Sequence, residues 1–339
     1  MKFVNPSEAQ VVAIVQAMYA VASAAGRVQP QPFEIACIEA AQRHLLGQDP
    51  PRPALPGPLP DDLATALATP ALRKSTVRLL ATVSIADKQV SPEKVAVVED
   101  AAIRLGISEF GLLVLRRVAR RQYRRNGFGL MKRFVNHYWS YTGHATARDW
   151  AAMLWTMMPW LPGLRSYLKL PEVQARYRAL ANLPEDTLGY AVHGYYARNG
   201  FPMPGEPKSI PEGWARHEVY HVLANYNTNL QGELLLAGFI GGNTDEMCLD
   251  LMLPALVQLH AGKTFVPGPA AEGLLRPDAF FRAVARGAAM NVDLLKGWRL
   301  WEVATQPLQD IRDRYGIPPF TPQELPPLVA ENALLVSAA

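Results

Sequence analysis

The stretch "RHEVYHVLANYNTNLQGE", residues 216–233, predicts two helices joined by a short polar turn, with candidate metal ligands on both. His217 and His221 are four residues apart, so on a helix their imidazoles share one face and can reach a single ion about 2.0 to 2.1 Å from each nitrogen. The S-x-x-E capping box at 209–212, with proline in its first turn, predicts a helix beginning at Ile210. Asn225 and the polar run after it should end that helix.

The second helix should bring a glutamate to the same ion. Thr228 and Gln231 form another capping box, which predicts a helix beginning at Asn229. His221 then lies about one turn before the break and Glu233 about one turn after it, so in an antiparallel hairpin the two face each other. The apolar sequence LLLAGFI follows Glu233, and an ionised carboxylate in such surroundings needs a cation or strong hydrogen bonds. The sequence therefore predicts a metal site.

The H-E-x-x-H motif leaves several chemistries open. In a zinc peptidase, Glu218 would be the catalytic general base that activates a metal-bound water. The twelve-residue step from His221 to Glu233 is short for glutamate-type peptidases, and the histidine-type sequel H-x-x-G-x-x-H is absent, so a peptidase is disfavoured. In the simplest alternative, two surface histidines and an ordinary carboxylate bind nothing. The reciprocal capping pattern and Glu233 argue against that alternative.

A series of short motifs spans residues 150–319. In order they are LPEDTLGYA, RHEVYHVLANYNTNLQGE, Arg286-Gly287, Trp301-Glu302 and LQDIRDRYGI. This succession resembles the ubiquinone biosynthesis family known as coenzyme Q protein four, whose most specific feature is H-D-x-x-H followed twelve residues later by glutamate. The resemblance implies an all-helical fold, a metal commonly described as zinc, and a prenylated benzoquinone precursor as ligand. It also implies oxidative removal of the ring carboxylate at C1, or a scaffold role for other quinone-biosynthesis proteins.

By this resemblance, His217, His221 and Glu233 fall on metal ligands, and Glu218 falls where the family has an aspartate that is also counted as a ligand. Glu218 lies about 100° around the helix from His217, so its reach decides whether it binds the same ion. Three protein ligands alone would leave an open position, which is typical of catalytic metals. Zinc is the expected cofactor, with iron or manganese as alternatives. The non-enzymatic alternative is a lipid- or quinone-binding scaffold whose ion stabilises the hairpin.

The first half of the chain predicts a helical domain with an internal repeat. Residues 20–41 align with the segment beginning at Thr82, and each copy has a small-residue helix end, a polar turn and a second helix with proline in its first turn. In the second copy, Ser91 is the predicted N-cap. The pair loosely resembles tellurite-resistance TerB-like domains over residues 11–107, a likeness that carries no function. The proline-rich segment 48–60 should be an exposed connector.

Length and composition suggest two domains. The chain has 339 residues, 49% apolar and 19% charged, and lacks convincing alternating strands, so the expected fold class is all-α. The expected regions are a TerB-like domain at 1–140, a coenzyme Q protein four-like domain at 141–325 and a tail at 326–339. No signal-peptide or membrane-spanning pattern occurs, and Cys37 and Cys248 should be buried thiols. We therefore expect a cytoplasmic protein, with peripheral attachment to the inner face of the membrane as a further expectation.

Residues 116–133, RRVARRQYRRNGFGLMKR, contain a dense set of arginines. On one helix, the arginines at 116, 120 and 124 would form a row beside those at 117, 121 and 125. A solvated helix side is the simplest interpretation, and an anionic membrane surface is the expected partner if the face is functional. Nucleic acid is not expected, because no recognised binding motif or aromatic stacking pattern accompanies the arginines.

Other side chains are weaker candidates for the site. His193 and His260 could orient a metal ligand by hydrogen bonding, although an ordinary core or surface position explains each more simply. The methionines and tryptophans at 153–160, with Trp214, could line a slot for an isoprenoid tail, although core packing is the default explanation. Near the end of the chain, residues 294–315 place apolar side chains close to a helical repeat, which predicts a core-facing helix.

Overall fold

The computed structural model is all-helical, as the sequence predicts. It describes residues 1–339 except 4–5, 141, 158–169, 211, 265–267 and 321–339, so the predicted tail at 326–339 lies outside the described residues. In the described part of the chain no β-strand forms, and two isolated bridges are the extent of extended pairing. None of the helices described has both the length and the apolar character that crossing a bilayer requires. Cys37 and Cys248 are both buried, as predicted.

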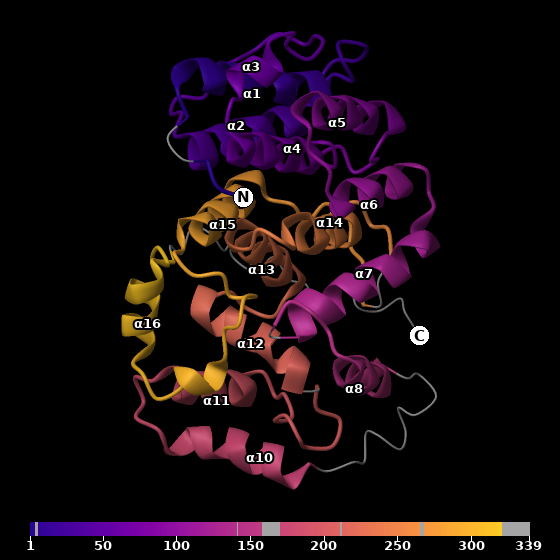
Figure 1. Ribbon diagram of the computed structural model, residues 1–339. Helices are drawn as coiled ribbons and strands as arrows, with labels where there is room; N and C mark the ends of the chain where they lie inside the picture. Colours follow the sequence, from indigo (N-terminus) through magenta and orange to yellow (C-terminus); the bar gives the residue numbers. More distant parts are fainter. Residues whose placement is uncertain (4–5, 141, 158–169, 211, 265–267, 321–339) are drawn as a thin grey trace.

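The N-terminal helices form a layer at one end of the molecule (Figure 1). They are α1 (Glu8–Ala22), α2 (Pro32–Leu46), α3 (Leu63–Ala66), α4 (Pro70–Val83) and α5 (Pro92–Leu105). α5 begins at Pro92 and the Ser91 side chain accepts a hydrogen bond from its first turn, as predicted, whereas α2 begins at Pro32. The connector 48–60 contains no helix, but Leu59 is buried, so the connector is not wholly exposed.

The arginine-rich segment 116–133 is not one helix, contrary to the prediction. α6 (Phe110–Ala119) ends because Arg121 takes a left-handed conformation (φ 57°) and the Gln122 N–H donates to the Arg117 carbonyl at 2.8 Å. After it come a 3-10 turn, η1 (Tyr123–Asn126), then α7 (Gly127–Arg133) and a π-helical segment, η2 (Phe134–Trp139). The arginine rows therefore do not share one helical face. Two of the arginines pair with acidic side chains, Arg116 with Glu99 and Arg133 with Asp250.

The second half of the chain surrounds a central helix, α13. Its elements are α8 (Ala147–Met157), α10 (Pro171–Arg178), η3 (Ala179–Asn182), α11 (Leu188–Arg198), α12 (Glu212–Ala224), α13 (Leu230–Asn243), α14 (Cys248–Leu259), α15 (Pro277–Ala289), η4 (Leu300–Glu302) and α16 (Leu308–Tyr315). α13 packs against α14 and α15. The backbones of α13 and α15 approach so closely at Gly287 that a Cβ there would lie 1.8 Å from the Phe239 carbonyl oxygen. Only glycine fits this contact.

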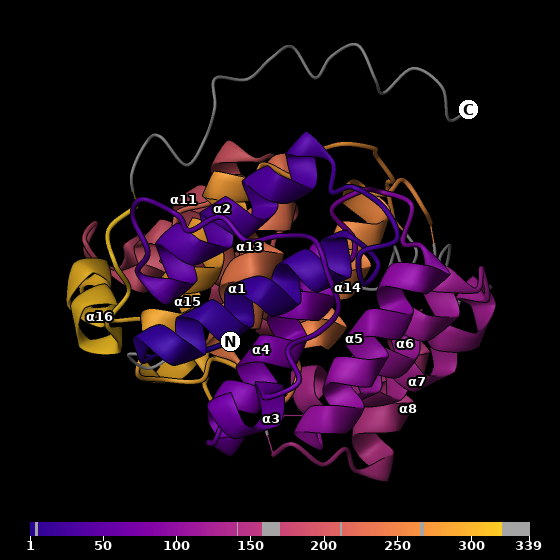
Figure 2. The same ribbon diagram turned by 90° about the horizontal axis from the view of Figure 1, so that it is seen from above.

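The two halves of the chain share one hydrophobic core. The layer of α1–α5 lies against α13–α15 in both views (Figures 1 and 2), with α2 along α15 and with α4 and α6 against α14. Buried residues from both halves belong to a single cluster. A polar contact joins the halves as well, since His44 Nε2 lies 2.7 Å from the Asp278 carboxylate. The core is therefore continuous across residue 140, where the sequence suggested a boundary.

The apolar stretch 294–315 is not the single helix that its pattern predicts. Within it only η4 and α16 are helical, because Gly297 has a left-handed φ of 71° and Pro307 precedes the first turn of α16. Leu294, Trp298 and Ile311 are nonetheless buried, so the apolar pattern correctly marks core residues.

Candidate metal centre

The helices α12 and α13, joined by the turn 225–229, carry the predicted ligands. α12 ends where Asn225 takes a left-handed conformation (φ 62°) and the Tyr226 N–H donates to the His221 carbonyl at 3.2 Å. α13 begins at Leu230, one residue later than predicted, because Asn229 is its N-cap and its side chain accepts from the Gly232 N–H at 2.7 Å.

The end of α12 is held by two arginines from later helices. Arg286 on α15 donates to the Ala224 carbonyl at 3.0 Å and to the Tyr226 hydroxyl at 2.8 Å. Arg312 on α16 donates to the Val222 carbonyl at 2.8 Å. Cations at this position satisfy carbonyls that lack helical partners and interact favourably with the helix dipole. The turn between the two ligand-bearing helices therefore has a fixed geometry.

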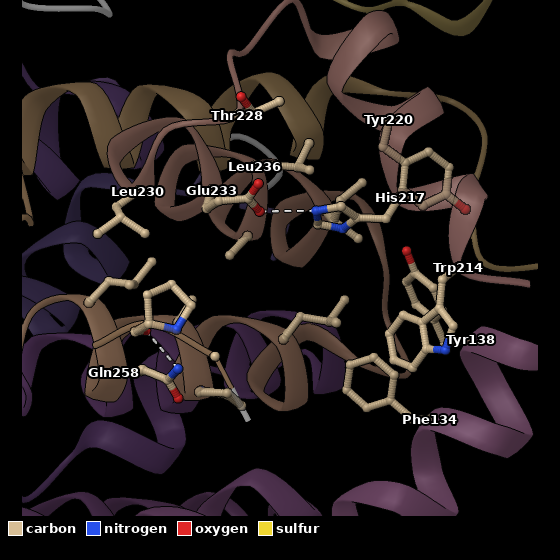
Figure 3. A pocket seen from close by; sticks show the side chains of 18 residues that line it. Phe134, Tyr138, Trp214, His217, Tyr220, Thr228, Leu230, Glu233, Leu236 and Gln258 are labelled. Atoms are coloured by element: carbon tan, nitrogen blue, oxygen red, sulfur yellow. Dashed lines mark hydrogen bonds and ion pairs between the residues drawn. The ribbon is translucent and has the colours of Figure 1, made fainter. Parts of the chain in front are cut away.

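His217, His221 and Glu233 converge on one point, and Figure 3 shows His217 and Glu233 directed toward each other. His217 Nε2 lies 3.0 Å from Glu233 Oε2, His221 Nε2 lies 3.1 Å from Glu233 Oε1, and the two Nε2 atoms are 3.2 Å apart. Ligand atoms about 2.0 to 2.1 Å from a tetrahedral ion are roughly 3.3 Å apart. The two Nε2 atoms match this separation, one Glu233 oxygen faces each ring, and one ligand atom from each residue lies within 4.8 Å of the others. Within the described ranges, no other group of three such side chains has this convergence.

The contacts within this group shift the pKa values of Glu233 and His217. Burial by itself would raise the pKa of Glu233, but hydrogen bonds from His217 and His221 outweigh it and lower the pKa to about 2. Burial would lower the pKa of His217, and the bond to Glu233 raises it above its ordinary value. Glu233 is thus an ionised carboxylate that attracts positive charge, whether the charge is a proton on His217 or a metal ion.

The site is closed on one side and open on the other. The His221 side chain is 0% exposed, whereas Glu233 is 32% and His217 36% exposed. A structural metal is normally enclosed by four protein ligands, and a catalytic metal keeps a position for water or substrate. Three converging ligands with an exposed side match the second pattern.

Groups from two neighbouring segments orient His221. Its Nδ1 donates to the Tyr226 carbonyl at 3.3 Å, which fixes the ring with Nε2 facing Glu233. The ring of Tyr195, on α11, stacks on the imidazole with 5.8 Å between centroids and 22° between planes. Sequence reasoning did not identify Tyr195 or Tyr226 as part of the site.

Glu218, predicted as a catalytic residue and as a fourth ligand, lies outside the converging group. Its Oε2 atom accepts a hydrogen bond from the Tyr195 hydroxyl at 3.1 Å. Glu218 is therefore directed toward α11, and the reason is its position about 100° around α12 from His217. Tyr195 therefore contacts two residues of the H-E-x-x-H motif: its ring stacks on His221, and its hydroxyl donates a hydrogen bond to Glu218.

The two other predicted histidines do not orient the ligands. His260 Nε2 donates to the Ala86 carbonyl at 3.1 Å and His260 Nδ1 accepts from the Leu275 N–H at 3.3 Å, so this histidine joins the end of α14 to the N-terminal layer. His260 is thus an ordinary buried histidine, which is the simpler of the two explanations given for it. His193 is half-buried on α11, and the described contacts of the three ligands do not include it.

His217 and Glu233 border an apolar cavity of about 480 Å³. One wall is aromatic, and aliphatic side chains of α13 and α14 form much of the rest (Figure 3): Phe134, Tyr138, Trp214 and Tyr220, then Leu230, Leu236, Ile240, Leu251 and Leu259. Trp214 thus borders a cavity, as the predicted slot requires. Met153 is buried but does not line it, and residues 158–160 of the predicted slot lie outside the described residues.

No protein-family model matches the chain, and neither a curated protein nor a solved structure is significantly similar to it.

Proposed function

We propose that the protein binds a divalent metal ion, zinc in the first instance, through His217, His221 and Glu233 and acts on a prenylated hydroxybenzoate or related quinone precursor. The observation that carries the proposal is that His217 and Glu233, which contact each other at 3.0 Å and the buried His221 at 3.2 and 3.1 Å, open onto an apolar cavity with an aromatic wall. Such a cavity suits a ligand that is mostly apolar and has one polar end. The motif resemblance of residues 150–319 supports the same ligand class.

The proposed reaction is loss of the ring carboxylate at C1. The C1–carboxylate bond breaks, carbon dioxide leaves, and the electron pair remains on C1, where a proton takes it up. In the oxidative form, dioxygen and a two-electron donor replace the carboxylate by a hydroxyl group and yield water. A bound divalent cation supplies Lewis-acid stabilisation of negative charge.

The protein side chains have separate tasks in this proposal. The aromatic wall packs against the ring, and the aliphatic wall of α13 and α14 packs against the prenyl tail. Glu218, held by the Tyr195 hydroxyl beside His221, is the proposed proton acceptor and donor. Because Glu218 is not among the cavity-lining residues, it serves this role through a change of its side-chain rotamer or through water.

Release of labelled carbon dioxide tests the reaction. Purified, zinc-loaded protein is incubated with a carboxyl-labelled prenylated para-hydroxybenzoate, with and without dioxygen and a two-electron donor. Release should depend on the loaded metal and should be lost in His217→Ala. If release from the wild-type protein does not exceed that of the variant, the enzymatic function is rejected. Iron- and manganese-loaded samples identify the active metal.

The competing function is a lipid- or quinone-binding scaffold with a structural metal, favoured by the position of the ligands on two helices joined by a turn. A structural ion contributes its binding energy to folding, so chelation should then sharply lower the melting temperature. Equal melting temperatures with and without chelator, together with loss of activity, support the enzyme.

We also propose that the protein associates with an anionic membrane, where its lipid ligand and other quinone-biosynthesis proteins would be found. The arginines at 120, 121 and 125 are exposed and shortly precede Phe128, which is 71% exposed. Basic residues near an exposed aromatic ring suit an anionic lipid surface. Flotation with anionic but not neutral vesicles, abolished at high salt, is the expected result. Equal flotation with both vesicle types contradicts it.

A further inference from the structure

The aromatic wall of the cavity holds Tyr138 in one orientation. Its ring lies 5.3 Å from the Phe134 ring and 5.7 Å from the Trp214 ring, centroid to centroid, and meets Tyr220 edge-on at 6.4 Å. The Arg216 guanidinium stacks over the ring with its carbon 4.9 Å from the centroid. Contacts from η2 and α12 therefore fix where the hydroxyl points.

The Tyr138 hydroxyl has no hydrogen-bond partner among the described residues, although the residue is only 4% exposed and lines the cavity. Burying a hydroxyl without a partner is unfavourable, and few native polar groups remain in that state. The neighbouring tyrosines differ in this respect. Tyr220 donates to the Leu294 carbonyl at 2.7 Å, and Tyr195 donates to Glu218.

The hydroxyl is directed toward the candidate metal centre. In Figure 3 it points to the His217 side of the cavity, away from Phe134. Burial raises the pKa of Tyr138 well above its ordinary value, the nearby Tyr220 adds to this, and the carboxylates Glu218 and Glu233 raise it further. Tyr138 is consequently a neutral O–H group at neutral pH, able to donate a hydrogen bond into the cavity.

We propose that Tyr138 is a ligand-binding residue whose hydroxyl donates a hydrogen bond to an oxygen of an oxygenated aromatic ring bound between the aromatic wall and the His217–Glu233 pair. The identity of this ligand rests on the proposed function. A ring in that position would stack against Trp214 or Phe134 and would place an oxygen substituent where Tyr138 lacks a partner. Tyr138 would then distinguish oxygenated rings from apolar rings of the same shape.

The test compares Tyr138→Phe with a matched control, Tyr196→Phe. Tyr196 is 0% exposed, and its hydroxyl also lacks a described partner, but it does not line the cavity. Calorimetry measures binding of prenylated para-hydroxybenzoate and of a prenylated benzene without ring oxygens to the zinc-loaded full chain. Tyr138→Phe should weaken binding of the hydroxybenzoate at least about tenfold, while binding of the prenylated benzene and the zinc content stay unchanged. Tyr196→Phe should change none of the three.

Three results overturn the inference. They are equal hydroxybenzoate binding by Tyr138→Phe and wild type, no hydroxybenzoate binding by wild type, and a lower melting temperature for Tyr138→Phe alone, which would reveal a structural partner for the hydroxyl. The experiments distinguish failure of the Tyr138 hypothesis from failure of the proposed decarboxylation. Carbon dioxide release with unchanged binding by Tyr138→Phe rejects the role of Tyr138 only, and selective weakening without any release rejects the reaction only.

Discussion

Replacing Glu233 with glutamine should destabilise the metal-free protein, because the Glu233 carboxylate binds both histidines through charge-assisted hydrogen bonds. Although burial favours the neutral acid, the two histidines lower the Glu233 pKa from an ordinary 4.5 to about 2. At about 1.36 kcal/mol for each pH unit, this difference corresponds to roughly 3 kcal/mol. The carboxylate is 32% exposed. Screening by solvent therefore reduces the expected loss to about 1–2 kcal/mol.

The pH dependence of this loss follows from the directions in which the two pKa values move. A carboxyl pKa that is lowered by folding stabilises the folded state above 4.5, and the contribution is lost as the pH falls toward about 2. The pKa of His217 is raised above 6.5, so its contribution is complete below 6.5 and is lost as the pH rises through the raised value. The effect of Glu233→Gln should be largest between these limits and smaller in alkaline solution.

Thermal unfolding of chelator-treated protein measures the effect. Between pH 4.5 and 6.5 the variant should melt about 1–3 °C below the wild type. At an unfolding entropy of about 2.1 cal/mol/K per residue, a change of 1 kcal/mol shifts the melting temperature of a chain of this length by about 1.4 °C. Glu218→Gln is the matched control, because the Glu218 carboxylate accepts from Tyr195 rather than from the histidines. Equal melting of Glu233→Gln and wild type in this range, or a difference that is independent of pH, would refute the reasoning.

Three further changes test other parts of the structure. His221→Ala removes the ligand that is 0% exposed and should prevent stoichiometric zinc binding in elemental analysis; retention of one zinc per chain would contradict the assigned ligand set. Gly287→Ala would place a Cβ 1.8 Å from the Phe239 carbonyl oxygen. It should lower the melting temperature by several degrees, because overpacking costs about 1–3 kcal/mol or more. An unchanged melting temperature would mean that α15 can shift freely. Tyr195→Phe should keep zinc but slow decarboxylation about as much as Glu218→Gln, with the double variant no slower, whereas additive losses would show that the two residues act independently.

The ligand-bearing helices were predictable because their signals are local. The four-residue spacing of His217 and His221 places both imidazoles on one helical face whatever the rest of the chain does. Asn225 and Asn229 mark the end of one helix and the start of the next, which brings Glu233 opposite the histidines. These features depend on helix geometry and capping, and the sequence carries both.

The partners of the ligands could not be predicted because tertiary packing supplies them. Tyr195 comes from α11 and bonds to Glu218, 23 residues further along the chain, and no spacing rule relates positions so far apart. The sequence could not identify the partner of His260 either, since the hydrogen bond from its Nε2 to the Ala86 carbonyl spans 174 residues. Such contacts are set by how α11 and α14 pack.

The arginine-rich segment misled for a local reason. Helices commonly end at a glycine in the left-handed conformation, but here Arg121 takes that conformation, so no glycine or proline marks the end of α6. The helical pattern of arginines continues in the sequence across a break in the backbone. What the pattern did indicate correctly is solvent exposure, because the arginines at 116, 120, 121 and 125 are all exposed.

The rest of the fold holds His217, His221 and Glu233 in an arrangement close to the one that a metal ion requires. The two Nε2 atoms already lie 3.2 Å apart, close to the roughly 3.3 Å that a tetrahedral ion imposes, and Glu233 contacts both rings, so binding exchanges a proton for a cation with little rearrangement. That preorganisation depends on the turn held by Arg286, which belongs to α15. α15 in turn packs between α13 and α2. The N-terminal layer therefore contributes to the candidate metal centre indirectly, by packing against the helix that holds the turn. The three converging ligands themselves all come from α12 and α13.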